Sequence, residues 1–234
     1  MNRRKFLKTL SAATAMAGAG PFLAQESLPP VTLPTPEKDG GKSVLAALRE
    51  RKTNRNISAK KLPPQMLSNL LWAAVGVNRK NGPFGQLGRT AASASNSQEI
   101  DIYVALPEGT YQYEAVPHRL APVAAEDLRE KAISRGQRST AAGQAPVNLI
   151  YVADIAKYSQ AGFQEPGLRD PEIQKSYYNV ATGLIAGNVY LFAASQGLAA
   201  WFHNCDKEGL AKALKLRPDQ RALYGQTVGY PARS

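Results

Sequence analysis

The chain has 234 residues, which is enough for one domain with a sizeable core, and its hydrophobic share of 44% is ordinary for a globular protein. A single cysteine excludes an intramolecular disulfide and a multi-cysteine metal site, and two histidines are too few for a convincing metal centre. The net charge is +11, and subtracting the four cations of residues 1–24 leaves +7, which favours anionic ligands. Because the basic residues are spread along the chain, we do not expect nucleic-acid binding.

Residues 1–24 are typical of a targeting segment rather than of folded structure. Arg3-Arg4-Lys5-Phe6-Leu7-Lys8 precedes a mildly apolar run, and this order resembles a twin-arginine export signal. The resemblance implies a bacterial protein that folds before it crosses the membrane and works in the periplasm or another extracytoplasmic place. A basic disordered tail is the alternative interpretation.

Residues 25–41 are rich in proline and glycine and predict a linker or extended arm before one domain that spans residues 42–234. A short helix over residues 43–52 then leads into a basic cluster, which consists of Arg51, Lys52, Thr53 and Arg55. Guanidinium groups and a hydroxyl in close succession suit a phosphate, because the guanidinium forks match its oxygens. A solvated basic helix end is the alternative.

A second helix is predicted over residues 64–74, followed by a mobile loop rich in glycine and asparagine over residues 78–88. The next segment, residues 89–98, is small and polar. Its backbone amides, hydroxyls and side-chain amides can surround a flat polar ligand, and the candidate residues are Ser93, Ser95, Asn96 and Gln98.

The pattern predicts an α+β fold, with a mixed or antiparallel central sheet of about five strands flanked by helices. Residues 100–106 and 110–113 indicate a hairpin, and three further strands are expected at residues 147–153, 198–202 and 222–230. Two shorter helices are expected at residues 126–134 and 206–215. The connector over residues 155–169 has no clear pattern and is a candidate lid.

A long central helix is predicted over residues 171–196, with Asp170 as its N-cap and Gly197 as its left-handed C-terminal residue. Apolar residues cover nearly its whole circumference, so we expect it to be buried rather than half-exposed. Gly183 and Gly187 lie one turn apart and allow another backbone to approach closely. The many amide, hydroxyl and tyrosine side chains of this helix argue against a membrane span.

The strand that follows this helix ends at His203-Asn204-Cys205, and this end is a candidate ligand wall. Cys205 has no basic partner nearby in the sequence apart from His203, so we interpret it as a structural thiol rather than as a nucleophile. We expect His203 to contribute a wall or a hydrogen bond rather than to act as a general acid.

Taken together, these segments resemble the nitroreductase family of FMN oxidoreductases from about residue 42 to residue 231. Residues 51–55 are similar to the family's basic phosphate motif, and residues 92–98 to its Pro-Ser-Ser-x-Asn-x-Gln loop. Residues 193–198 with 203–205 are similar to its helix end, Gly-Leu turn and flavin-edge segment, and residues 228–231 to its closing Gly-Tyr-Pro. The order and spacing of these blocks carry the resemblance, since no single block is specific.

The segment Leu70-Leu71-Trp72-Ala73-Ala74 and the hairpin around Tyr111-Gln112-Tyr113 resemble the branch that includes the azoline oxidases of modified-peptide synthesis. The chain also departs from the family. Ala92 replaces a proline, Glu99 follows Gln98 where a proline is usual, and residues 203–205 replace a Gly-Gly-like or Glu-Gly pair. Arg233 is the cation found where the family often places a late phosphate-binding residue.

The resemblance implies an enzyme, an exported FMN-dependent oxidoreductase that reduces a small organic acceptor, such as a quinone or a nitroaromatic, by ping-pong electron transfer from a separate donor. It implies a homodimer with FMN between the subunits, no catalytic side chain, and a binding set drawn from the blocks above. That set is Arg51, Lys52, Thr53, Arg55, Ser93, Ser95, Asn96, Gln98, His203, Asn204, Cys205 and Arg233. The alternatives are a non-catalytic flavin-binding envelope protein and a substrate-specific flavin oxidase or dehalogenase of the same fold.

Overall fold

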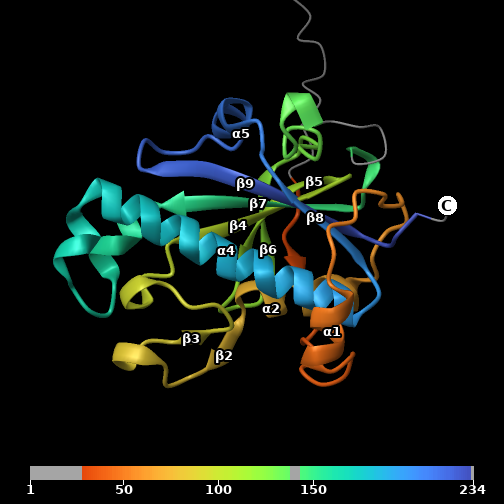
Figure 1. The fold of residues 1–234 in the computed structure, drawn as a ribbon. Coiled ribbons are helices and arrows are strands. Elements are labelled where there is room, and N and C mark those ends of the chain that lie inside the picture. Colours follow the sequence, from red (N-terminus) through yellow and green to blue (C-terminus); the bar gives the residue numbers. More distant parts are fainter. Residues whose placement is uncertain (1–27, 138–142, 233–234) are drawn as a thin grey trace, which may run out of the picture.

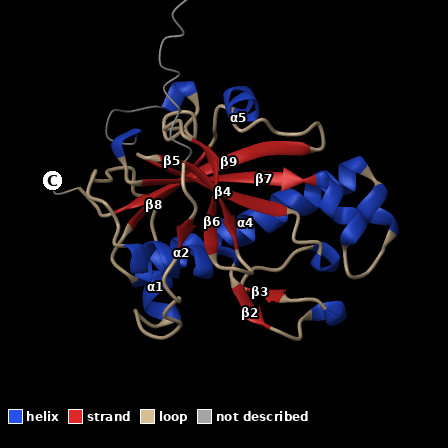
Figure 2. Ribbon diagram, turned by 180° about the vertical axis from the view of Figure 1, so that it is seen from behind, coloured by secondary structure: helices blue, strands red, loops and turns tan. Residues whose placement is uncertain are grey.

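The computed structural model describes residues 28–137 and 143–232. The export signal expected in residues 1–24 lies outside these ranges, and so does Arg233. The structure is built around a seven-stranded sheet in which every paired strand runs antiparallel to its neighbours, and helices lie on both of its faces (Figures 1 and 2). The α+β prediction is confirmed, although the sheet has two strands more than the five expected.

The strands follow the order β1-β6-β5-β4-β7-β9-β8 across the sheet. Their bounds are β1 Val31–Thr32, β4 Ile100–Leu106, β5 Gly109–Glu114, β6 Arg119–Ala124, β7 Val147–Asp154, β8 Ala199–His203 and β9 Gln220–Gly229. The expected hairpin is β4–β5, whose register pairs Val104 with Tyr111.

Alternate residues of the central strands bury their side chains in two separate cores. On β4, Ile102 and Val104 belong to the core beneath α2 (Pro64–Val75) and α4 (Pro171–Ser195). Tyr103 and Ala105 point to the opposite core, which α5 (Lys207–Ala213) covers with Leu210. Because both faces of β4 and β7 are covered, these strands are buried along their whole length and are mostly hydrophobic.

The central helix α4 begins and ends as expected. The Asp170 side chain accepts hydrogen bonds from the backbone N–H groups of Glu172 and Ile173, and Gly197 adopts a φ of 68° just beyond the helix. Ile185 and Val189 are buried against the sheet, which stabilises the fold by about 1.5–3 kcal/mol for each such side chain. In the described part of the chain, no helix has the length and apolar character needed to cross a membrane.

The expectation that α4 is buried on all sides is wrong for this chain. Val180 is 62% exposed and Leu184 is 46% exposed, on the side of the helix that faces away from the sheet. Nothing lies within 4 Å of a Cβ added at Gly183 or Gly187, so the glycine positions open onto free space. Apolar residues around the whole helix predicted burial on every side, but in the single chain the sheet covers only one side of the helix.

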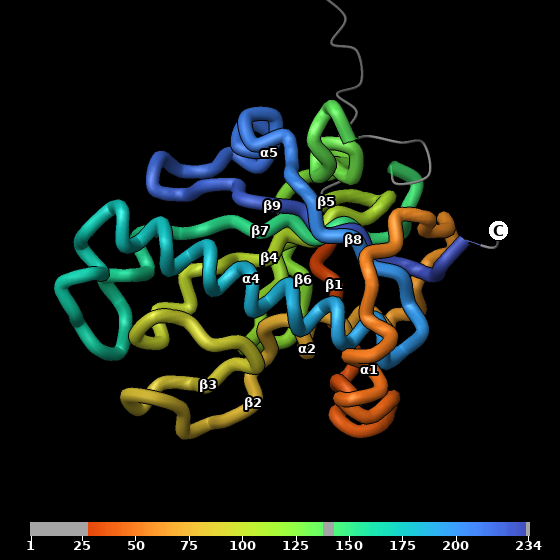
Figure 3. Tube along the Cα trace, viewed as in Figure 1, coloured from red at the N-terminus to blue at the C-terminus, as the bar shows by residue number. Residues whose placement is uncertain are grey.

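The expected linker contains part of the sheet. Within residues 25–41, β1 pairs with β6 through Val31 and Leu120, and Figure 3 shows this arm running beside β6. The buried Leu33 and a hydrogen bond from the Glu37 backbone N–H to the Asn69 side chain (2.8 Å) attach the arm to the domain.

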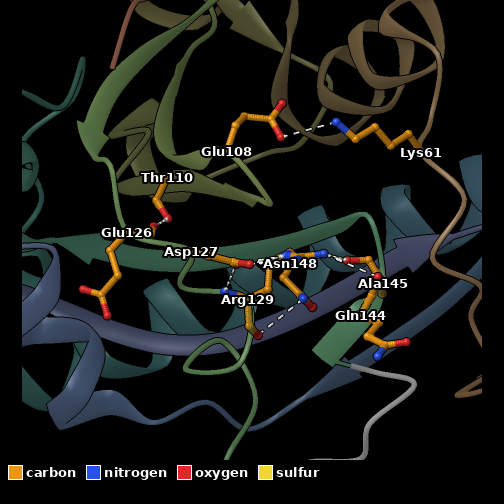
Figure 4. A network of polar contacts seen from close by, with 9 residues as sticks. All are labelled: Lys61, Glu108, Thr110, Glu126, Asp127, Arg129, Gln144, Ala145 and Asn148. Atoms are coloured by element: carbon orange, nitrogen blue, oxygen red, sulfur yellow. Dashed lines mark hydrogen bonds and ion pairs between the residues drawn. The ribbon is translucent and has the colours of Figure 1, made fainter. Parts of the chain in front are cut away.

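Two local expectations are wrong. The loop over residues 78–88 includes a two-stranded hairpin formed by β2 (Val77–Arg79) and β3 (Gly88–Arg89). Residues 126–134 form turns instead of a helix. The Asp127 carboxylate accepts from the backbone N–H of Arg129 (3.0 Å), a local bond that competes with helical pairing, and also holds the Arg129 guanidinium (Figure 4).

The short helix α1 (Val44–Glu50) is confirmed, with Ser43 as its N-cap, and it packs beside the C-terminal half of α4. Its apolar residues do not enter the core. Val44, Leu45 and Leu48 are 67%, 79% and 52% exposed, and only Ala47 is buried. Both helices therefore carry exposed apolar side chains, and we refer to this set, Val44, Leu45 and Leu48 on α1 with Val180 and Leu184 on α4, as the α1–α4 face.

Candidate functional site

The basic segment, residues 51–55, lies against β8 and the C-terminal half of α4. The backbone N–H of Asn54 donates to the carbonyl of Ala200 (2.9 Å). The hydroxyl of Tyr190 on α4 accepts from the backbone N–H of Phe202 (2.8 Å) and lies 3.1 Å from Oγ1 of Thr53. Tyr190 thus joins the helix, the strand and the basic segment at one atom.

The two arginines of this segment are stacked on aromatic rings. Cζ of Arg51 is 5.4 Å from the ring centroid of Tyr190, and Cζ of Arg55 is 5.4 Å from that of Trp201. Within the described ranges, neither arginine nor Lys52 forms an ion pair with a carboxylate. Stacking fixes the guanidinium planes and leaves their N–H edges open, which suits an anion that has several oxygens.

A hollow of about 240 Å³ adjoins the basic segment. Lys52, Asn54, Tyr190 and Glu50, whose carboxylate is paired with Lys42, line it together with small residues at the end of α4 and the start of β8. Small side chains there allow a ligand to approach the backbone closely. The structure therefore places Lys52 at the hollow. Arg51 lies nearby over Tyr190, Arg55 lies over Trp201 on the other face of β8, and neither arginine lines the hollow itself.

The polar loop, residues 93–98, has an unusual backbone. Ser95, Asn96 and Gln98 all have positive φ, at 48°, 54° and 51°, a conformation that costs non-glycine residues energy and occurs often at functional sites. Ser93 Oγ accepts from the backbone N–H of Gln98 (2.9 Å). The side-chain amides of Asn96 and Gln98 both donate to the carbonyl of Leu87, at 3.2 and 2.8 Å. The loop is thus tied to the β2–β3 hairpin.

His203 and Cys205 lie on the other face of β8 from Tyr190. His203 is 4% exposed and packs on Trp201, with its Nε2 2.9 Å from Oγ1 of Thr227. Cys205 belongs to the core beneath α5, where burial raises the pKa of its thiol to about 11 and keeps it protonated. Asn204 is exposed between them. Strand alternation accordingly points these two predicted ligands into the interior.

Burial lowers the pKa of His203 to about 4, so the folded state holds a neutral imidazole that the unfolded chain would protonate near pH 6.5. Between these values the unfolded state binds more protons, so the free energy of unfolding falls as pH falls from 6.5 to 4. The expected loss is about 3 kcal/mol. Chemical denaturation across this range measures it, and His203→Gln should flatten this part of the profile; an unchanged slope in the variant would contradict the assignment.

A single chain does not bring the basic segment and the polar loop around one cavity. The polar loop contacts the connector before α4, where the backbone N–H of Gly162 donates to the carbonyl of Ser95 (3.1 Å). The basic segment lies near the opposite end of α4 (Figure 1). The exposed α1–α4 face belongs to the same helix.

Two residues of this site were not among those expected from sequence: Tyr190 and Trp201, which carry the arginines. Tyr190 lies in an apolar helix and Trp201 in an apolar strand, and such surroundings predict a packing residue rather than one that contacts a cation. In residues 28–137 and 143–232, no group of three or more His, Cys, Asp or Glu side chains could hold a metal ion.

Comparison with known proteins identifies the family. The model of the nitroreductase family matches residues 48–230. A nitroreductase relative from Methanocaldococcus jannaschii is 27% identical over 157 residues, covering 64% of this chain and 73% of its own length. A crystal structure of a nitroreductase from Ralstonia eutropha JMP134 is 34% identical with a TM-score of 0.76, and the match covers 88% of this chain and 90% of that one.

One chain of the Escherichia coli microcin synthetase complex McbBCD, solved with truncated pro-MccB17 bound, has a TM-score of 0.62 at 19% identity. That match covers 97% of this chain and 85% of the other, and it shows likeness of fold alone. The family model spans the basic segment, the polar loop, α4 and the end of β9. The chain therefore belongs to the nitroreductase family, whose members are oxidoreductases.

Proposed function

We propose that this chain is an FMN-dependent oxidoreductase that passes electrons by a ping-pong cycle from a donor to a small organic acceptor, such as a quinone or a nitroaromatic. The observation that carries the proposal is the basic segment, in which Arg51 and Arg55 lie over aromatic rings and form no ion pair with a carboxylate of the described residues. Unpaired cations fixed beside a hollow suit the phosphate of FMN.

The residues present fit this cofactor. Arg51 and Arg55 would bind the phosphate, Thr53 would add a hydroxyl and Lys52 a further charge. Ser93, Ser95 and the exposed Asn204 are proposed to face the ring system. When bound, FMN supplies the hydride and electron chemistry, so the protein needs to bind and orient its ligands and to exclude water.

We propose that two copies complete each site, with FMN between the subunits and α4 at their interface. The polar loop and the basic segment lie apart in one chain, and the apolar side chains of Val180 and Leu184 on α4 are exposed. Gly183 and Gly187 would let a second helix approach closely. A partner chain would bring its own polar loop to this chain's basic segment.

The colour of the purified protein tests the cofactor directly. A flavin absorbance spectrum is expected, with reduction of the flavin by at least one donor in an anaerobic screen and reoxidation by a quinone or a nitroaromatic. A flavin that no donor reduces would favour a non-catalytic flavin-binding protein instead. A colourless protein that takes up no added FMN would contradict the proposal.

A second candidate is oxidation of a modified peptide. It is favoured by the likeness to a chain of the microcin synthetase complex over 97% of this chain, together with the sequence resemblance at residues 70–74 and 111–113. Anaerobic flavin reduction by an azoline-containing peptide, with no reduction by NADH or NADPH, would distinguish it from the leading proposal.

We further propose that the protein is exported by the twin-arginine route to the periplasm or another extracytoplasmic place. Changing Arg3 and Arg4 together to lysine is expected to leave the protein in the cytoplasm, because a receptor reads the arginine pair rather than its charge. Cell fractionation measures the distribution, with Lys5→Arg and Lys8→Arg as charge-neutral controls. Unchanged delivery of the double variant would contradict this route.

A further inference from the structure

A second cavity, of about 380 Å³, lies away from the basic segment, between the β3 end of the small hairpin and strands β4 and β5. Three apolar side chains line one part of it: Val75, Ile100 and Ile102. Arg89, Lys157 and Arg119 line it as cations, and Asp101 and Glu114 as acids. This mixture of an apolar wall and convergent charges is typical of a site for a small organic ligand.

Arg89 is the cation of this cavity that pairs with no carboxylate of the described residues. Its Nε donates to the side-chain oxygen of Gln98 (2.7 Å), but its Nη1 is buried and has no hydrogen-bond partner. The other two cations are paired, Lys157 with Asp101 (2.6 Å) and Arg119 with Glu114. In the described chain no carboxylate forms an ion pair with Arg89.

The nearest carboxylate of the cavity, Asp101, acts on Arg89 through space but is bonded to Lys157, and the other neighbours of Arg89 carry no negative charge. Tyr113 lines the same cavity, and burial raises the pKa of its hydroxyl, which therefore stays protonated. That hydroxyl lies 2.8 Å from Nδ1 of His118, whose pKa burial lowers, so the pair is neutral. An unpaired buried charge is costly, and native structures normally compensate it.

We propose that Arg89 binds the carboxylate of a small organic monoacid, whose apolar body lies against Val75, Ile100 and Ile102. A carboxylate accepts two parallel bonds from one guanidinium and would satisfy the buried Nη1. Asp101 and Glu114 line the same cavity and would repel a second negative charge, which disfavours phosphate and dicarboxylates. The phosphate part of the flavin proposal uses a different cavity, but Gln98 of the expected flavin-binding set lines this one and accepts from Arg89, so FMN and benzoate binding are measured separately below.

Thermal unfolding of the purified full-length protein tests the site, with benzoate as the probe and benzamide as its neutral analogue. Benzoate is expected to raise the melting temperature in a saturable way at constant ionic strength, whereas benzamide and inorganic phosphate are not. Arg89→Met keeps the apolar stem and removes the charge; it should weaken benzoate binding at least tenfold. Its melting temperature without ligand should not fall, because a buried charge without an ion-pair partner is gone.

Arg119→Met is the matched control, since Arg119 lines the same cavity but is exposed and already paired with Glu114. Its benzoate affinity should stay within about twofold of wild type. If Arg89→Met did not fold, Arg89→Lys would keep the charge without the fork, and unchanged benzoate binding in that variant would overturn the site. Phosphate protecting as well as benzoate, or Arg89→Met weakening FMN and benzoate by the same factor, would also overturn it.

Discussion

Replacing Arg51 by alanine is expected to weaken FMN binding about ten- to a hundredfold and to leave riboflavin binding nearly unchanged. Arg51 lies over the ring of Tyr190 and pairs with no carboxylate in residues 28–137 and 143–232, so its N–H groups can bind the phosphate. Hydrogen bonds to a charged group contribute about 1.5–3 kcal/mol each, which corresponds to this range of affinity. Riboflavin lacks the phosphate, so its affinity does not depend on this contact. Flavin fluorescence titration measures both affinities.

The matched control for this experiment is Arg49→Ala, which removes an exposed arginine two residues earlier on α1 and should change neither affinity. Asn96→Ala should give the opposite pattern to Arg51→Ala. Its amide holds the polar loop to Leu87, so both flavins should weaken together. If Arg51→Ala reduced FMN and riboflavin affinity by the same factor, the basic segment would be a solvated helix end, and the assignment of the phosphate site would be wrong.

The variant Val180→Glu is expected to convert the proposed dimer to a monomer and to abolish FMN binding. Val180 is 62% exposed in the single chain, on the side of α4 that carries Gly183 and Gly187. A carboxylate there would be buried without a partner in the interface, a cost of several kcal/mol that corresponds to at least a hundredfold in dimer affinity. Analytical ultracentrifugation and flavin absorbance on the same sample measure both losses.

Val123→Glu provides the control, because Val123 is an exposed valine on β6, away from the α1–α4 face. This variant should remain dimeric and yellow. Circular dichroism should show both variants folded. A wild-type protein that is monomeric yet binds FMN fully would contradict the shared site, and so would a monomeric Val180→Glu that keeps its flavin.

The elements that the sequence predicted well carry their own boundary signals. The helix α4 is bounded by an Asp-Pro start and a glycine with positive φ, and both signals act within one or two turns. Strands β4 and β7 are buried on both faces and mostly apolar, so a hydrophobic run identifies each of them whichever face a residue points to. The burial of α4 was not predictable in the same way, because apolar character does not tell whether a sheet or a second chain covers it.

The elements that were missed depend on distant partners. Strand β6 is short, contains Pro122 and is buried only at Leu120; it becomes a strand because β5 and β1 pair with it, which no local pattern reveals. The helix expected at residues 126–134 is reduced to turns, in which Asp127 accepts from the backbone of Arg129 and a single helical bond joins Ala132 to Leu128. Apolar spacing alone did not reveal that competition.

The same division applies to the candidate site. Arg51, Thr53 and Arg55 all fall within residues 51–55, so their proximity could be predicted from the sequence. Tyr190 is 137 residues from Thr53, and only the packing of α4 on β8 brings their hydroxyls together. His203 was selected by its position after a strand, but the alternation of that strand turned its ring inward.

The position of β9 between β7 and β8 has a kinetic consequence. It is the last strand in the chain, yet it occupies an interior place in the sheet. A growing polypeptide cannot close this sheet until residues 220–229 have been synthesised, so β7 must wait with an open hydrogen-bonding edge. Pairings this far apart in the sequence are slow to form, because loop closure costs entropy before the contacts repay it. The pairing of β9 with β7 and β8 should therefore limit the rate of refolding. In the cell, the incomplete sheet would need protection from aggregation during synthesis.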